Sequence, residues 1–536
     1  MKAKTRGHVR RWRLRAILLT LAAALAATAG RGWADGAGIA GLDLVQLLHL
    51  PAAGPHENQQ FLLALVFNGQ KLNAFMTTFE RGDKLFDAEL NALDGVGANI
   101  GHGARFTHVP RADLNGPTEW ASHRPARTTG PNSTSCLSCH GQVARDGAGF
   151  MATNVLRDPL RSGNVAQFIQ RNAPHVFGAG ALQRLAEEMT ATLQQLRSDA
   201  TAEACANGQA SRDLLAKTVS FGRITVTRTA ASPCQVQVST AEVKGIDADL
   251  IVRPFQWKGS VGSLREFSRN AANEELGLQA VELVGAGVDA DFDGVTDELS
   301  VGDVTALAVY VAAQPRPTTR GELAALHLIA PLGDAEKQSI LRGGEVFRQV
   351  GCASCHVPRL LLDDPVFTEP SQSAAYRDAV FPAGQDPVTE GLDPRYPISF
   401  DLTSGQPDNI LRDGSEQQRV IFRLGSFRKN SAGKAAILLF GDLKRHDMGA
   451  GLAEPVDETG RGASVFLTRN LWGAGSTAPY MHDGRATTLT EAILEHGGEG
   501  AASRDAFVAL QLNQQKDLLA FLNDMILFKL PRASGS

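Results

Sequence analysis

The sequence predicts a mainly α-helical protein that contains two copies of one small helical domain and a β insertion held by a disulfide. Three observations lead to this prediction. The motif C-x-x-C-H occurs twice, each copy is followed by a similar middle segment and a closing helical pattern, and alternating residues next to two further cysteines indicate a hairpin. A chain of 536 residues, 43% of them apolar, has enough material for two cores.

Helical patterns flank the second motif. A helix is expected from an N-cap at Asp334 into the motif, because apolar residues recur at roughly helical spacing at Ile340, Phe347 and Val350. A closing helix is expected over residues 514–526, after a cap at Asn513, with an apolar face formed by Leu518, Leu519, Leu522 and Met525.

The middle segment recurs with a shift of 225 residues. "WKGSVGSLREF" from Trp257 and "HDGRATTLTEA" from His482 share three positions in the same order: Gly259 and Gly484, Leu264 and Leu489, Glu266 and Glu491. Such ordered matches indicate a duplicated unit. We therefore expect an N-terminal domain over residues 131–316 and a C-terminal domain over residues 321–530, with "QPRPTT" as the linker.

An insertion is expected over residues 199–242. The stretches "ITVTRT" and "CQVQVST" alternate as the strands of a hairpin do. Cys205 and Cys234 lie outside both C-x-x-C-H motifs, and in an oxidising compartment they are expected to form a disulfide across this insertion. Two free thiols are the alternative.

Residues 1–34 predict an export signal. Lysines and arginines precede a short apolar run, residues 16–29, and small residues follow it, so cleavage is expected after Ala34 or Ala29. An uncleaved anchor is the alternative, although the run is too short and too Ala-rich for a stable membrane span. We expect a periplasmic protein, and the pattern of residues 35–130, an N-terminal extension, indicates no role.

The charge of the mature chain limits its ligands. Removal of residues 1–34 would take away eight basic residues and no acidic ones, so the formal net charge would change from −4 to −12. No basic stripe would survive. Nucleic acid is therefore not expected as a ligand, and a basic or neutral partner is easier to accommodate.

The C-x-x-C-H motifs predict two covalently bound c-type haems. Two thiols three residues apart can add to both vinyl groups of one haem, and the imidazole of the next residue can then reach the iron. The attachment residues are Cys136, Cys139 and His140 in the first motif and Cys352, Cys355 and His356 in the second. A zinc site or a thioredoxin-like redox pair are the alternatives.

Together with these motifs, "HDMGAGLAE" and "TAPYMHDGRATTLTEAILEHGGE" resemble the bacterial dihaem cytochrome c peroxidase superfamily, in particular its branch of dihaem oxidoreductases and peroxidases. The resemblance covers residues 245–530 and 130–200. It implies that a C-terminal haem takes an electron from a donor and passes it to an N-terminal haem, where peroxide binds. The superfamily also contains a cofactor-maturing enzyme and oxygenases, so the architecture is implied more firmly than the reaction.

The resemblance also implies two catalytic residues. "WKGSVGSLRE" places Trp257 where the family has a Trp between its haems, although Lys258 and Ser260 depart from the family pattern. "NEELG" offers Glu275, with Glu274 as a fallback, for the carboxylate that moves a proton between the peroxide oxygens. A structural tryptophan in the core and solvent-facing glutamates are the alternatives.

The second axial ligands are less defined by sequence. The stretch where peroxidases have a Met, "ASVFLTRNLWG", contains none, so Met448 is the expected ligand of the second haem, with His446 and His482 behind it. The first haem is expected to be open or weakly ligated, and its candidate histidines are His102, His108, His123 and His175.

One acidic stretch, "DADFDGVTDE", predicts a calcium loop. Its oxygen ligands would come from Asp289, Asp291, Asp293 and Asp297. Oxygens at alternate positions followed by Gly294 match the start of an EF-hand loop, but Ser300 stands where the final Glu would be. A solvated acidic turn is the alternative.

The leading function is reduction of hydrogen peroxide or another small oxidant, with electrons from a small redox protein. Reduction of peroxide to water takes two electrons, which explains why one chain would need two haems. A dihaem oxygenase or protein-modifying oxidase, and a non-catalytic dihaem electron carrier, are the alternatives.

Overall fold

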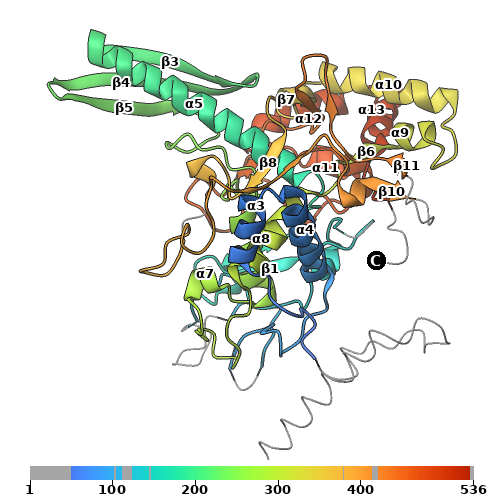
Figure 1. Cartoon of the computed structure of the whole chain (residues 1–536). Helices are drawn as coiled ribbons and strands as arrows, with labels where there is room; N and C mark the ends of the chain where they lie inside the picture. Colours follow the sequence, from blue (N-terminus) through green and yellow to red (C-terminus); the bar gives the residue numbers. More distant parts are fainter. Residues whose placement is uncertain are drawn as a thin grey trace, which may run out of the picture. The chain divides into compact units, whose positions relative to one another are not determined.

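The computed structural model describes residues 50–101, 104–111, 123–143, 146–377, 380–412 and 420–530. Its compact unit runs over Ala52–Ser536 (Figure 1). The expected export signal, residues 1–34, lies outside the described residues, as does His102. No helix within the described ranges is both long enough and apolar enough to cross a membrane.

The central helix of the first half is α8, which is buried along its whole length. Helix α4 packs closely on it, because a Cβ atom at Gly82 would lie only 2.1 Å from the carbonyl oxygen of Ala306. Residues 35–130 thus contribute helices to this core. The described helices are α3 (Gln59–Phe67), α4 (Lys71–Asp87), α5 (Ala179–Asn207), α6 (Leu264–Ala271), α7 (Val281–Val284), α8 (Val301–Ala312), α9 (Arg320–Ala325), α10 (Asp334–Gln349), α11 (Leu489–Leu494), α12 (Ala501–Val508) and α13 (Leu512–Asp524).

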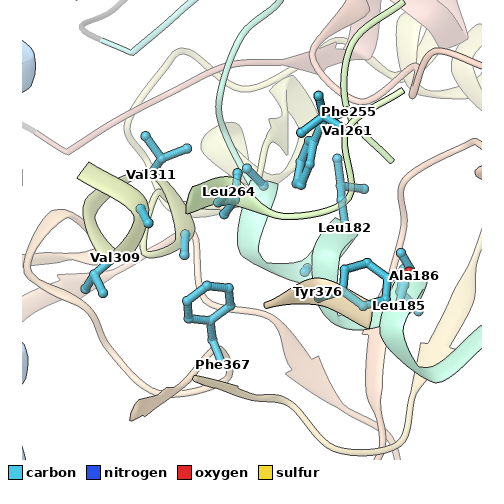
Figure 2. Packing of buried hydrophobic residues seen from close by; sticks show 14 of the residues in the cluster. Leu182, Leu185, Ala186, Phe255, Val261, Leu264, Val309, Val311, Phe367 and Tyr376 are labelled. Atoms are coloured by element: carbon cyan, nitrogen blue, oxygen red, sulfur yellow. The ribbon is translucent and has the colours of Figure 1, made fainter. Parts of the chain in front are cut away.

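The core joins both halves of the chain. Leu185 of α5, Leu264 of α6 and Val309 of α8 lie in one buried cluster with Phe367, which comes from the second half (Figure 2). Tyr376, also from the second half, is 3% exposed, and its hydroxyl lies 2.8 Å from the Thr190 hydroxyl on α5. Burial of such large side chains is worth about 1.5–3 kcal/mol each, so the two halves stabilise each other.

The predicted insertion and its disulfide are confirmed. Strands β3 (Gln209–Ala216), β4 (Val219–Ala231) and β5 (Cys234–Val243) form an antiparallel sheet in that order. The sheet packs along the second part of α5 (Figure 1). Cys205, near the end of α5, is bonded to Cys234 at the start of β5.

Removal of this disulfide should loosen the insertion. The bond closes a loop with a sequence separation of 29 residues, and a loop of that length stabilises by roughly 3–4 kcal/mol in the chain-entropy description. We expect the double variant Cys205→Ser/Cys234→Ser to be cut by protease within residues 199–243 at concentrations that leave the wild type intact. Unchanged haem content would serve as the control for the rest of the fold, and equal protease resistance would contradict the expectation.

The prediction of a mainly α-helical fold is wrong. The structure is 35% helix and 17% strand, a mixed α/β fold with several sheets. Outside the insertion the strands are only two to four residues long, too short for their alternation to be recognised in sequence. They pair as β1 (Val155–Arg157) with β2 (Ile169–Arg171), β6 (Thr318–Thr319) with β16 (Met525–Ile526), β7 (Leu360–Leu362) with β13 (Ala435–Ile437), β13 with β12 (Arg428–Lys429), β8 (Val366–Glu369) with β9 (Ile398–Asp401), β10 (Ile410–Arg412) with β11 (Val420–Arg423), and β14 (Arg445–Asp447) with β15 (Val465–Leu467).

The two helices expected around the second motif are present, with different caps. Helix α10 begins at Asp334 itself, after Gly333 as the N-cap residue, and leads into Cys352. Helix α13 begins at Leu512, where Gln511 rather than Asn513 forms a capping box. The two helices pack against each other, with Val346, Phe347, Leu518 and Leu522 buried in their shared cluster.

The repeated middle segments adopt the same local structure. Each closes a turn through an isolated β-bridge, and the two bridges are related by the same shift of 225 residues: Phe255 with Val261 and Tyr480 with Ala486. Helices α6 and α11 then begin at the matched Leu264 and Leu489, each after a hydroxyl N-cap. The repeat therefore corresponds to a repeated structural unit.

Candidate functional site

Both C-x-x-C-H motifs form the same compact turn. A 3-10 turn runs over Cys136–Ser138 in the first and over Cys352–Ser354 in the second. The four cysteines of the motifs are not disulfide-bonded. In each motif the backbone N–H of the histidine donates to the first cysteine's carbonyl, at 3.0 Å for His140 and 2.9 Å for His356. Each turn therefore presents two thiols and one imidazole together.

The two motif histidines are prepared as metal ligands. His140 Nδ1 lies 3.3 Å from the carbonyl oxygen of Gly147, and His356 Nδ1 lies 3.2 Å from that of Phe440. A carbonyl oxygen only accepts, so Nδ1 carries the proton and Nε2 keeps its lone pair. Burial lowers the pKa of both imidazoles, that of His356 to about 4, which keeps them neutral.

The second motif opens on a cavity that also contains a histidine unnoticed in sequence, His496. The imidazole centroids of His356 and His496 are 6.3 Å apart. This separation leaves room for one metal ion between the rings, because a metal–imidazole bond is about 2 Å long. His496 Nδ1 donates to Ala492 O at 2.8 Å, so its Nε2 is also unprotonated. The donor set therefore fits a metal held by two imidazoles.

The expected ligand Met448 lines the same cavity beside His496. A Cβ atom at Gly500 would lie 3.3 Å from Met448 Cε and 3.2 Å from His496 Cβ. His446 is occupied elsewhere, since its ring nitrogens lie 2.8 Å from carboxylate oxygens of Asp442 and Glu499. Burial opposes its charge, yet hydrogen bonds to Asp442 and Cys355 raise the pKa of His446 to about 10. A protonated imidazole does not bind metal.

The first motif opens on a smaller, apolar cavity that contains Glu275. Among the residues that the structure describes, His140 is the one histidine that lines it. The other lining side chains are largely apolar and include Leu85, Phe86, Leu90, Leu276, Leu278 and Leu299. This cavity therefore offers one imidazole and one carboxyl group, in contrast to the two imidazoles of the second cavity.

Glu275 is held at this cavity by a π-helical turn, Ala272–Leu276, that continues α6. Its backbone carbonyl accepts from the N–H groups of Asn132 and Ser133, and its Oε2 accepts from Asn132 Nδ2 at 2.7 Å. Burial raises the pKa of Glu275 to about 7, against the opposing charge of Arg157. The carboxyl group can therefore both give and take a proton near neutral pH.

Glu274, the fallback, is turned away from the cavity. Its carboxylate pairs with Arg157 at 2.5 Å and accepts from the Thr128 hydroxyl at 3.1 Å. Arg157 also pairs with Glu458 of the second half at 3.1 Å. Glu274 therefore contributes to a salt-bridge network rather than to the cavity.

Trp257 lies in the wall of the second cavity, on the side of the first motif. Its Nε1 donates to the carbonyl of Asn172 at 2.9 Å. The chain then continues to Pro174, whose carbonyl lies, like that of Gly147, at the His140 ring. Residues 172–174 thus separate the tryptophan from the first motif histidine. The ring of His482, at the repeat position that matches Trp257, lies 6.4 Å from the indole, measured between centroids.

The remaining histidines lie away from the first cavity. His175 lines the second cavity and its Nε2 lies 3.1 Å from Trp472 O. His123 is buried beside Arg127, and His108 is exposed. His482, the other alternative at the second cavity, stacks on Phe466 with centroids 4.4 Å apart.

Arg469 is a second feature that the sequence reasoning missed. It lines the second cavity, and its guanidinium lies 4.9 Å from the centre of the Trp257 ring. Within the described ranges it forms no ion pair, and burial lowers its pKa to about 10. A cation without a carboxylate partner at a cavity wall fits the carboxylate side chains of a haem. The signal was the "TRN" that precedes Leu471, quoted above only for its lack of Met.

Comparisons with known proteins agree with the motifs. Residues 425–525 match the family model described as "Di-haem oxidoreductase, putative peroxidase". This segment contains Met448, His482 and His496. The predicted resemblance is thereby confirmed. No curated protein matches the chain.

Two solved structures are similar over long stretches at low identity. A MauG-like protein associated with microbial copper homeostasis is 18% identical, with 54% of this chain and 76% of that chain covered and a TM-score of 0.26. A hydrazine synthase of Kuenenia stuttgartiensis is 13% identical, with 92% and 96% covered and a TM-score of 0.31. Both TM-scores lie below 0.5, so neither structure carries an argument about this chain.

Proposed function

Through residues 425–525 the chain belongs to the dihaem oxidoreductase family, and from this premise we propose that it is an exported peroxidase that reduces hydrogen peroxide at its N-terminal haem. The observation that carries the proposal is the difference between the two cavities. Glu275 faces the cavity of His140, whereas His496 faces His356 across the other. One site thus keeps room for a substrate, and the other is closed by two imidazoles.

The residues of each motif would hold one haem covalently, through thioether bonds from Cys136 and Cys139 and from Cys352 and Cys355. When bound, the haems supply iron that changes oxidation state, so that electrons can be stored and passed on one at a time. The N–H groups of His140 and His356 orient each imidazole, and Arg469 would bind an anionic side chain of the second haem. Covalent attachment can be tested by denaturing electrophoresis with haem staining.

Glu275 would move the proton in the reaction H₂O₂ + 2 H⁺ + 2 e⁻ → 2 H₂O. Its Oε2 is engaged by Asn132, which leaves Oε1 for the substrate. A carboxylate oxygen beside bound peroxide can take the proton of one peroxide oxygen and return it to the other, so that water becomes the leaving group. The apolar cavity wall excludes bulk water and keeps the pKa of Glu275 near 7, where both steps are accessible.

We place electron acceptance at the C-terminal haem, because two imidazoles leave no open position for substrate at that site. A small redox protein would donate the electron. The mature chain would carry a net charge of −12, so the complementary donor is basic or neutral at its contact surface. Export to the periplasm follows in this proposal from residues 1–34.

Trp257 would connect the two sites. It lines the second cavity and is hydrogen-bonded to the segment that contacts His140, so an aromatic ring lies between the two motifs. We expect Trp257→Phe to slow electron transfer between the haems by roughly tenfold, about 1.4 kcal/mol in barrier. Trp472→Phe, at a buried tryptophan outside the cavity lining, is the matched control. Stopped-flow spectra after reduction of the second haem measure the rate, and an equal effect of both variants would contradict a connecting role.

The test of the proposed function is a titration. The purified dihaem protein is reduced by one electron and mixed with hydrogen peroxide, while both Soret bands and donor oxidation are followed. Fast peroxide consumption with continuing turnover is expected. A persistently altered Soret band without turnover would instead indicate an organic or protein substrate, and complete inertness would indicate an electron carrier.

A further inference from the structure

The loop of residues 289–297, between α7 and α8, brings acidic side chains together. One oxygen from each of Asp289, Asp291 and Asp293 lies within 4.8 Å of the other two. Asp289 is fixed by the loop itself, since its carboxylate accepts from the N–H groups of Asp293 and Gly294 at 3.1 and 3.0 Å. Three carboxylates at this separation repel one another unless a cation lies between them.

Two deeply buried oxygens at this loop lack partners. Asp291 is 0% exposed, and its Oδ1 accepts no hydrogen bond from the described residues. Glu298 is 4% exposed; its Oε2 accepts from the Gln279 N–H at 2.7 Å, but its Oε1 has no partner in the described part of the chain. Burial, reinforced by the charges of Asp291 and Asp293, raises the pKa of Glu298 to about 10. Unsatisfied buried oxygens are costly and point to a missing ligand.

Two arginines face the cluster and leave room for a cation. Arg127 donates to Asp291 Oδ2 at 2.9 Å, and Arg105 pairs with Asp293 Oδ2 at 2.5 Å. Asp291 Oδ1 is not used by either contact. With Glu298 included, four carboxyl groups face two guanidinium groups, which leaves an excess of up to two negative charges.

We propose that this loop binds one Ca²⁺ ion through carboxylate oxygens of Asp289, Asp291 and Asp293, with Glu298 as the additional acid. Hard oxygen donors at alternate positions, followed by a glycine in a left-handed turn, suit calcium. Gly294 has φ +94°. Asp297 instead accepts from the Gly287 N–H at 2.7 Å. Ser300, at the position of the usual final Glu, caps α8 and donates to Glu57 O, so it does not act as that ligand.

The ion would also brace the wall of the first cavity. Besides Asp291, Arg127 donates to the carbonyls of Asn273 at 2.8 Å and Gly277 at 2.9 Å. These residues lie two positions before and after Glu275, so one guanidinium joins the acidic loop to the π-helical turn. A cation that fixes Asp291 would thereby restrict the turn that presents Glu275. The relevance of this brace for peroxide rests on the proposed function, but the binding of calcium does not.

The test uses the dihaem protein after removal of metal with EGTA. Titration with calcium chloride in a calorimeter should give one site, and a hundredfold excess over Kd should raise the unfolding temperature by about 2–3 °C. Asp289→Asn keeps the loop's backbone hydrogen bonds and removes one charge, and should abolish both effects. Asp334→Asn, at an exposed acid of α10, is the control and should bind as the wild type does.

The brace is read by hydrogen exchange rather than by turnover. Calcium should slow amide exchange over residues 272–278 in the wild type and in Asp334→Asn, and leave it unchanged in Asp289→Asn. No calorimetric binding by the wild type, or equal binding by Asp289→Asn, would overturn the site. Binding without any change in exchange at residues 272–278 would overturn the brace. Neither readout requires peroxidase activity, so failure of the proposed function would be seen separately.

Discussion

Glu275→Gln should lower kcat/KM for hydrogen peroxide by about a hundredfold to ten-thousandfold, the usual contribution of a general acid–base group. Gln is nearly isosteric and can still hydrogen-bond to Asn132, but it cannot exchange a proton. Because the pKa of Glu275 is about 7, its carboxylate form is lost as the pH falls below 7. Wild-type kcat/KM should therefore decline with decreasing pH through this value, and the decline should be absent from the variant. Steady-state kinetics from pH 5 to 9 measures both effects.

Glu274→Gln is the matched control for that measurement. Its carboxylate pairs with Arg157 and does not line the cavity, so activity should change far less. The spectra of both haems and the unfolding temperature should remain close to those of the wild type in Glu275→Gln. A variant with full activity, or one whose pH profile keeps the same limb, would remove Glu275 from the reaction.

The sequence sufficed where the chemistry is local. Two thiols and an imidazole within five residues define each haem attachment, and the structure places Cys136 and Cys352 in the same turn because the spacing is the same. The disulfide and its sheet were also predictable, since alternation extends over strands of 8–13 residues. Strands such as β6 and β16 were not, because each has two residues and pairs with a partner about 200 positions away.

The second axial position failed for a related reason. His496 lies 140 residues beyond His356, and no local pattern joins them, so the sequence directed attention to Met448. The duplication nevertheless contained a signal. The repeated helix α6 leads to Glu275 in the first unit, and its counterpart α11 leads to His496 in the second. Comparable positions of the repeat thus supply the residue that faces each motif histidine.

His496→Met should raise the reduction potential of the C-terminal haem by on the order of 100 mV or more, because a thioether favours the reduced iron relative to an imidazole. The side chain has similar length, and Met448 and Gly500 already border the position. Potentiometric titration followed in the visible spectrum would resolve the two haems. The N-terminal haem, whose cavity His496 does not line, is the internal control.

Met448→Leu distinguishes the two candidate ligands. It removes the thioether and keeps an apolar side chain of similar volume, so the potential of the C-terminal haem should change little if His496 is the ligand. A large fall in potential for Met448→Leu, with His496→Met silent, would restore Met448 as the ligand. The C-terminal haem would then have a higher potential than two imidazoles give. Its driving force for taking electrons from the donor would be correspondingly greater, and the distinction therefore decides which class of donor can reduce the protein.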